Sequence, residues 1–104
     1  MFKILRTQKF IEQFQQLPKQ TQEEIKKLRD KLKENPFVGD PLGFKFFREK
    51  KFGGLRLYFL VYEDIVVVLF VALSDKKTQQ STIDEVKLNL KEYWQEVHKS
   101  LKDN

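Results

Sequence analysis

The side chains best able to do chemistry in this sequence are cationic, and several of them lie in one short stretch. Arg48, Lys50 and Lys51 stand just before a pair of glycines, and Arg56 follows just after it. Arginine and lysine bind phosphate oxygens through charge-assisted hydrogen bonds. Glu49, within the same stretch, could accept a proton. The spacing therefore predicts a phosphate-binding site with a carboxylate beside it.

A second cationic group comes after the longest apolar run of the chain. It consists of Lys76 and Lys77, followed closely by Gln79, where we expect a loop to lead into the last helix. Backbone amides at a helix start attract phosphate, and two neighbouring lysines strengthen that attraction. Tyr58 and Tyr62 form a third group, although tyrosines in such apolar surroundings more often belong to the core or to an interface.

These residue types suit the cleavage of RNA, in which the 2′-hydroxyl is an internal nucleophile. A protein then needs to align that hydroxyl with phosphorus, stabilise the added negative charge and help the proton transfer. Arg56 and the lysines suit the second task, and a lysine of lowered pKa or Glu49 suits the third. Arg48, Lys45, Gln79 and Tyr58 are further candidates for RNA contact. DNA lacks the 2′-hydroxyl, so we expect RNA as the substrate.

Composition excludes several other kinds of site. The chain has 104 residues with no cysteine and a single histidine, His98. Thiolate chemistry, disulfides, two-histidine metal sites and paired-histidine acid–base schemes are therefore excluded. We expect no metal and no cofactor.

The charge of the chain favours an anionic partner, with one plainer alternative. The formal net charge is +5 and the pI is near 9.4. Residues 45–56 carry five basic side chains against one acidic, so much of the excess is local. Such residues bind nucleic acid or an acidic protein segment, or they only solvate an edge strand and block aggregation.

The basic residues belong to a stretch, residues 44–80, that predicts a three-stranded antiparallel meander. Residues 65–73 are an uninterrupted apolar run rich in β-branched side chains, typical of a central strand buried on both faces. Residues 55–62 form the strand before it, joined by a tight turn at Glu63-Asp64, and residues 44–52 form the first strand.

The length of the glycine turn decides which residues face Arg56. A turn made of Gly53-Gly54 alone puts Lys51 opposite Arg56 and Glu49 opposite Tyr58. A turn one residue longer gives those places to Lys50 and Arg48.

Helical patterns flank the meander. Residues 1–6 predict a short edge strand, Thr7 predicts the N-cap of a first helix, and a second helix runs from after Pro18 to about Glu34. Thr82 with Glu85 has the form of a capping box, which predicts an amphipathic helix of about twenty residues.

The fold class is therefore α+β, in the order β-α-α-β-β-β-α. A helical hairpin packs on an antiparallel sheet, and a long C-terminal helix lies near the other face or edge of the sheet. The length predicts a single domain over residues 1–104. The N-terminus lacks an export signal, so we expect a cytoplasmic protein without a membrane segment.

Part of this pattern resembles a known family. The resemblance lies in the segment RLYFLVYEDIVVVLFVALSDKKTQQSTIDEVKLNL, residues 56–90. This segment resembles the RelE/ParE toxin superfamily of type II toxin–antitoxin systems, and its DKKTQQST junction looks most like the HigB and phage-derived Gp49-like branch. The helical hairpin before the meander also fits the topology of that superfamily.

The resemblance implies a ribosome-dependent endoribonuclease that cuts mRNA and is held inactive by a cognate antitoxin. Arg56 then matches the phosphate-binding strand arginine of the family. Lys51 or Lys50 matches the basic residue one strand earlier, and Lys76 or Lys77 the basic residue after the last strand. The tyrosine of RelE near the start of the final helix is absent, because Thr82 or a neighbour stands there.

Two other functions fit the same resemblance. ParE-like members inhibit DNA gyrase and cleave nothing, and a catalytically silent member would act only by binding. The apolar stripe of the C-terminal helix also suits a partner or a homodimer.

Overall fold

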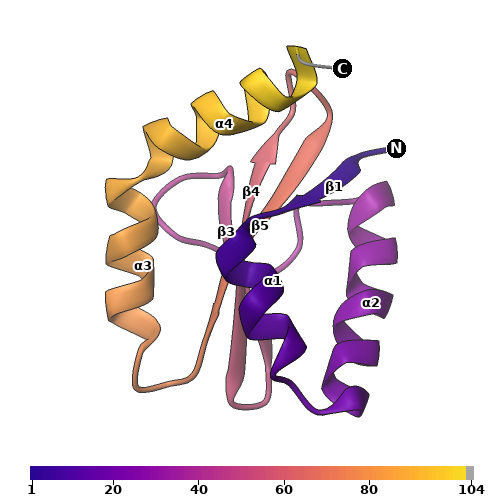
Figure 1. Cartoon of the computed structure of the whole chain (residues 1–104), viewed down its shortest axis with the longest axis vertical. Coiled ribbons are helices and arrows are strands. Elements are labelled where there is room, and N and C mark those ends of the chain that lie inside the picture. The colour runs from indigo at the N-terminus through magenta and orange to yellow at the C-terminus, as the bar shows by residue number, and fades with distance from the viewer. Residues whose placement is uncertain (103–104) are drawn as a thin grey trace.

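Five strands of the computed structural model form one sheet, covered by helices on both faces (Figure 1). The structure describes residues 1–102. The elements in chain order are β1 (Lys3–Arg6), α1 (Gln8–Gln15), α2 (Lys19–Glu34), β2 (Asp40–Pro41), β3 (Phe47–Phe52), β4 (Leu55–Tyr62), β5 (Val67–Ser74), α3 (Gln79–Leu88) and α4 (Leu90–Lys102). The predicted α+β class is confirmed.

The strand order is β1-β5-β4-β3-β2, with β4 at the centre. The predicted meander of β3, β4 and β5 is confirmed as antiparallel, whereas β1 pairs with β5 in parallel. The prediction of a purely antiparallel sheet is corrected at that edge. The two-residue strand β2, which the sequence did not indicate, lies at the other edge.

Alternation along β4 divides the core into two layers. Leu57, Phe59 and Val61 face the helical hairpin of α1 and α2, where they join Phe10 and Leu32. The intervening residues of β4 face α3 and α4. On that side the buried cluster is formed by Tyr58, Leu60, Tyr62, Ile83, Val86 and Val97, among others. The predicted placement of the helices on the sheet is thus confirmed.

A β-bulge in β5 changes this alternation close to the end of the strand. Tyr58 pairs with Ala72 and Phe59 with Phe70, so Val71 is the extra residue. Val71 and Ala72 consequently both join the layer under α3 and α4. The bulge also brings Ser74 to that layer.

The predicted helices α1 and α2 are confirmed closely. Thr7 is the N-cap of α1, and its hydroxyl accepts a hydrogen bond from the Phe10 amide at 3.1 Å. The second helix begins after Pro18 and ends at Glu34, as the sequence indicated.

The predicted capping box at Thr82 is wrong. Helix α3 begins at Gln79 with Thr78 at its N-cap, and Thr82 is a buried interior residue whose amide donates to the Thr78 carbonyl. The single long helix is also wrong, because the chain turns at Asn89 and α4 continues in another direction (Figure 1). No helix within residues 1–102 has both the length and the apolar character needed to cross a membrane.

Two strand boundaries also differ from those predicted. Residues 44–46 form a turn, so β3 begins at Phe47. The turn after β4 spans residues 63–66, two residues more than predicted, and β5 begins at Val67.

Candidate functional site

Arg56 lies near the start of β4 on the sheet face covered by α3. Its Nη1 donates to the Gly54 carbonyl at 2.8 Å, and its Nε has no hydrogen-bond partner among the described residues. Only 8% of Arg56 is exposed. Within residues 1–102 it forms no ion pair, so its charge remains available to an anion.

The short form of the glycine turn is the one observed, and this decides between the two lysines. Gly53 and Gly54 alone connect β3 and β4, with a positive φ of 57° at Gly53. Lys51 pairs with Arg56 across the two strands, while Lys50 pairs with Leu57 and therefore lies on the opposite face. The exposed Lys51 is thus the lysine beside Arg56.

Glu49 is nearly buried beneath the first turn of α3. It pairs with Tyr58 across the strands, and only 3% of it is exposed. The Gln79 side-chain amide donates to Glu49 Oε2 at 2.9 Å, which links the start of α3 to β3. Gln79, predicted to contact RNA, therefore holds the candidate base instead.

Tyr58 is fully buried, so it offers no surface to an RNA strand in this structure. The Tyr58 hydroxyl and the Ser74 hydroxyl are 2.9 Å apart. The pKa of Tyr58 is raised to about 12, chiefly by burial; the neighbouring Glu49 carboxylate also raises it, while the Ser74 hydrogen bond and Arg56 oppose the shift. At neutral pH Tyr58 is therefore a neutral phenol within a buried polar cluster of Glu49, Tyr58, Ser74 and Gln79.

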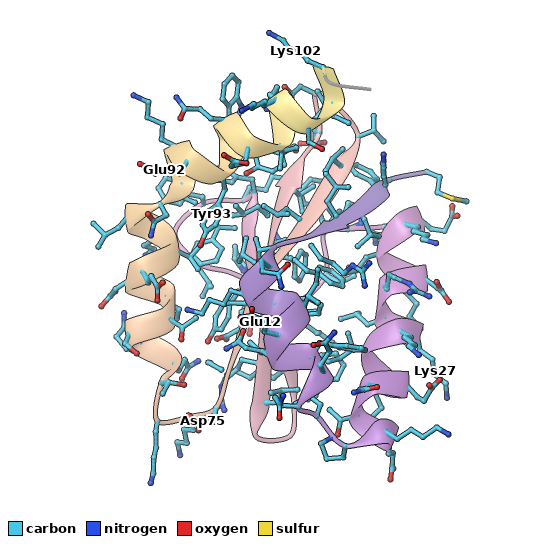
Figure 2. The ribbon with its side chains drawn as sticks, viewed as in Figure 1. Glu12, Lys27, Asp75, Glu92, Tyr93 and Lys102 are labelled. Atoms are coloured by element: carbon cyan, nitrogen blue, oxygen red, sulfur yellow. The ribbon has the colours of Figure 1, made fainter. Side chains whose placement is uncertain are left out.

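A tight turn carries Lys76 and Lys77 to the same end of the sheet. Ser74 pairs with Arg56, so the segment that follows leaves the sheet beside that arginine. Asp75 Oδ1 accepts hydrogen bonds from the Thr78 amide at 2.9 Å and the Thr78 hydroxyl at 3.0 Å, and the amide bond contributes most to the lowered pKa of Asp75. Both lysines are exposed. Figure 2 shows Asp75 at the end of the molecule where the β3–β4 turn lies.

Arg48 is used by the fold and not by this cluster. Its guanidinium donates to three backbone carbonyls, those of Val38 at 2.8 Å, Lys45 at 2.9 Å and Gly39 at 3.2 Å. It lies on the α1–α2 side of the sheet, opposite Arg56. The predicted RNA contact of Arg48 is therefore not compatible with this geometry. Lys45 is exposed on the loop that Arg48 holds.

Ser74 is the member of the polar cluster that sequence reasoning missed. It is the first polar residue after the longest apolar run, which was the available signal. The tyrosine of the last helix, Tyr93 in α4, lies near the α3–α4 junction and away from Asp75 (Figure 2).

Two grooves, of about 490 and 410 Å³, flank β1 and are lined by none of the candidate residues. Another groove, of about 360 Å³, is lined in part by Ser74, Asp75 and Thr78. Lys51 and the Lys76–Lys77 turn are exposed at one end of the sheet beside the largely buried Arg56, and we call these four residues the cationic end. Such a surface suits an extended polyanion better than a small enclosed ligand.

Comparison with known proteins identifies the fold. No family model matches the sequence, and neither does any curated protein. The isolated E. coli RelE toxin matches with a TM-score of 0.66 and 16% identity, over 83% of this chain and 99% of RelE. RelE in the intact E. coli RelBE toxin–antitoxin complex gives 0.67 and 19%, over 72% and 96%.

An archaeal structure is similar to this chain to a comparable degree. The RelE–RelB complex from Pyrococcus horikoshii matches with a TM-score of 0.64 and 17% identity, over 72% of this chain and 94% of that one. These likenesses show that the chain has the RelE fold.

Proposed function

We propose that this protein, which has the RelE fold, is the toxin of a type II toxin–antitoxin system and cuts mRNA in the translating ribosome. The observation that carries the proposal is the likeness itself, which spans nearly the whole length of RelE. The cationic end supports the nuclease activity, because it joins Arg56 and Lys51 on one face of adjacent strands.

Arg56 and Lys51 stabilise the reacting phosphate in this proposal. The 2′-oxygen attacks the adjacent phosphorus, and negative charge grows on the phosphoryl oxygens. The bond to the 5′-oxygen then breaks, which leaves a 2′,3′-cyclic phosphate, and the 5′-oxygen takes a proton from water to become a hydroxyl. Two cations held in place before the reaction lower the energy of that charge without reorganising. Lys76 and Lys77 bind neighbouring phosphates, and this aligns the strand.

Glu49 accepts the proton of the 2′-hydroxyl. It is the carboxylate that β3 and β4 direct to the α3 face at this end of the sheet. Because Gln79 covers it, the Gln79 amide must yield its place to the hydroxyl when RNA binds. In this proposal the reaction proceeds without the family tyrosine, because Arg56 and Lys51 stabilise the charge of the reacting phosphate.

An antitoxin is the expected protein partner. The solved RelE structures from E. coli and Pyrococcus horikoshii include complexes with RelB. We expect a member of the HigB and Gp49-like branch, because the DKKTQQST junction resembles that branch; here it forms the turn before α3 and the first residues of this helix. We expect a cytoplasmic protein.

The test is induced expression of the wild type and of Lys51→Ala and Lys50→Ala variants, with growth and the 5′ ends of mRNA followed together. These lysines are neighbours on β3 and face opposite sides of the sheet, so each controls for the other. We expect arrest and new 5′-hydroxyl ends within reading frames for the wild type and Lys50→Ala. Lys51→Ala should reduce cleavage by on the order of 10²-fold.

Other results would redirect or remove the proposal. Arrest without new 5′ ends would point to a protein target such as gyrase. Equal loss in both lysine variants would show that the face of β3 does not matter, and no arrest in the wild type would favour binding alone. Thermal melting of each variant separates loss of activity from loss of the fold.

A further inference from the structure

Two phenylalanines lie exposed on the loop before β3. Phe44 is 44% exposed and Phe46 is 36% exposed, and their ring centroids are 5.0 Å apart with planes inclined at 32°. The inclined rings cover each other only in part, so aromatic surface remains open to solvent. Large exposed apolar groups in contact with each other mark binding surfaces more often than isolated ones do.

The loop that carries this phenylalanine pair is held firmly by hydrogen bonds. The Phe47 amide donates to the Phe44 carbonyl at 3.2 Å, and the Val61 amide to the Phe46 carbonyl at 2.8 Å. Arg48 adds its bond to the carbonyl of Lys45, the residue between the two rings. The rings are therefore presented on a preorganised backbone, which reduces the entropy lost when a ligand stacks on them.

Two lysines belong to the surroundings of the pair. Lys45 stands between the two phenylalanines in sequence, with its Nζ 4.5 Å from the centroid of the Phe37 ring, and Lys87 Nζ of α3 lies 3.4 Å from where a Cβ on Gly43 would be. Figure 1 shows this loop beside the junction of α3 and α4. Exposed aromatic rings on a loop with lysines nearby suit a single-stranded nucleic acid, whose bases stack while its phosphates pair with the cations.

The pair lies along one path with the cationic end. Gln79 at the start of α3 contacts Glu49, and Lys87 near the end of the same helix has its Nζ 3.4 Å from where a Cβ on Gly43 would be. Along β3, the five residue steps from Phe46 to Lys51 span roughly 17 Å. A single strand of a few nucleotides spans such a distance.

We infer that Phe44 and Phe46 form a stacking surface for unpaired bases of the RNA that the cationic end cleaves. The inference rests on the proposed function for the identity of the ligand and adds the nucleotides that flank the cleaved bond. Base recognition by stacking tolerates any sequence but requires a base.

The test compares two probes that carry the same phosphates. One is a short, fluorescently labelled 2′-O-methyl oligonucleotide, which cannot be cleaved, and the other is its abasic analogue. For the wild type, anisotropy titration should show about tenfold tighter binding of the probe with bases. A variant with Phe44→Leu and Phe46→Leu should lose that difference and keep its affinity for the abasic probe. Leu88→Ala, at an 82% exposed apolar position in the same region, should retain the difference.

The leucine variant separates stacking from simple apolar contact, because it keeps most of the apolar surface without the rings. If it retained the preference for bases, or if the wild type bound both probes equally, the inference would be overturned, and a protein partner would be the better occupant. Circular dichroism melting checks that the variant is folded. Because neither probe can be cut, these outcomes are independent of whether mRNA is cleaved in cells.

Discussion

Two buried arginines on neighbouring strands serve different purposes because their donors meet different groups. The Arg48 guanidinium donates hydrogen bonds to three carbonyls of the loop before β3. Arg56 donates from Nη1 to the Gly54 carbonyl, and its Nε has no partner among the described residues. An arginine whose hydrogen bonds are filled by backbone stabilises the fold, whereas one with free donors beside an exposed lysine is suited to an anion.

We predict that Arg48→Ala lowers the free energy of unfolding by about 2 kcal/mol, because it removes charge-assisted hydrogen bonds to three carbonyls. Lys50→Ala, a half-exposed position on the same face of β3, should change it by less than about 0.5 kcal/mol. Urea unfolding measures both values. Equal, small effects would show that the loop does not depend on the guanidinium.

The cluster at Arg56 could be predicted only up to a choice of register. Residue types marked Arg56, Lys51 and Glu49 as candidates, yet a turn of two or three residues selects a different set, and both lengths fit a glycine pair. The position of Ser74 could not be predicted from the sequence, for another reason. Its position on the α3 face depends on the bulge at Val71, and nothing in an uninterrupted apolar run marks a bulge.

At the scale of the elements, apolar periodicity predicted well which helices and strands exist and predicted poorly where they begin and end. It identified α1, α2, β4 and the buried β5, because their burial patterns are strong. It misplaced the start of α3, since the Asp75 turn sets Thr78 as the N-cap and leaves Thr82 inside the helix. Side chains that bond to nearby backbone decide such starts, and the sequence offered two threonines.

The turn between β4 and β5 holds a residue that does not suit its conformation. Val66 has a φ of 57°, in the left-handed region that β-branched side chains disfavour, and it is 42% exposed. Its backbone closes the turn, since its amide donates to Glu63 and its carbonyl accepts from Lys3. The hydrogen bond from the Lys3 amide helps to hold β1 in place, and this pairing compensates for the strain at Val66.

We predict that Val66→Gly raises the free energy of unfolding by about 1 kcal/mol, because glycine adopts a positive φ without the steric cost. The melting temperature should rise by about 4 °C. Differential scanning calorimetry measures it. Ile65→Gly is the matched control, since Ile65 packs against the core and its loss should destabilise. A lower melting temperature for Val66→Gly would show that the valine side chain contributes more by contact than its backbone costs.

At the scale of the whole molecule, covering both faces of the sheet leaves all three tyrosines partly or fully inside. Burial raises the pKa of Tyr58 to about 12, and burial also raises the pKa values of Tyr62 and Tyr93 above the ordinary value of 10.0. Tyr62 differs from Tyr58 because its buried hydroxyl has no partner among the described residues. At alkaline pH the folded state thus retains phenolic protons that the unfolded chain has already released.

The sign of the resulting pH dependence follows from these raised pKa values. Below about pH 10 both states keep the protons, and the stabilising contribution is complete. As the pH rises from about 10 through 12, the unfolded state loses them first, so the free energy of unfolding falls by about 1.4 kcal/mol per pH unit for each tyrosine involved. Urea unfolding at a series of alkaline pH values measures this slope, and tyrosinate absorbance follows the ionisation.

Tyr62→Phe isolates one of the three contributions. The variant removes a buried hydroxyl without a partner among residues 1–102, so we expect its stability at neutral pH to equal or exceed that of the wild type. Its loss of stability above pH 10 should be shallower by about 1.4 kcal/mol per pH unit. Tyr58→Phe should have a similar effect on the slope but lower the neutral-pH stability, because it leaves Ser74 without its hydrogen bond. An unchanged slope in both variants would mean that the phenols ionise equally in the folded and unfolded chain.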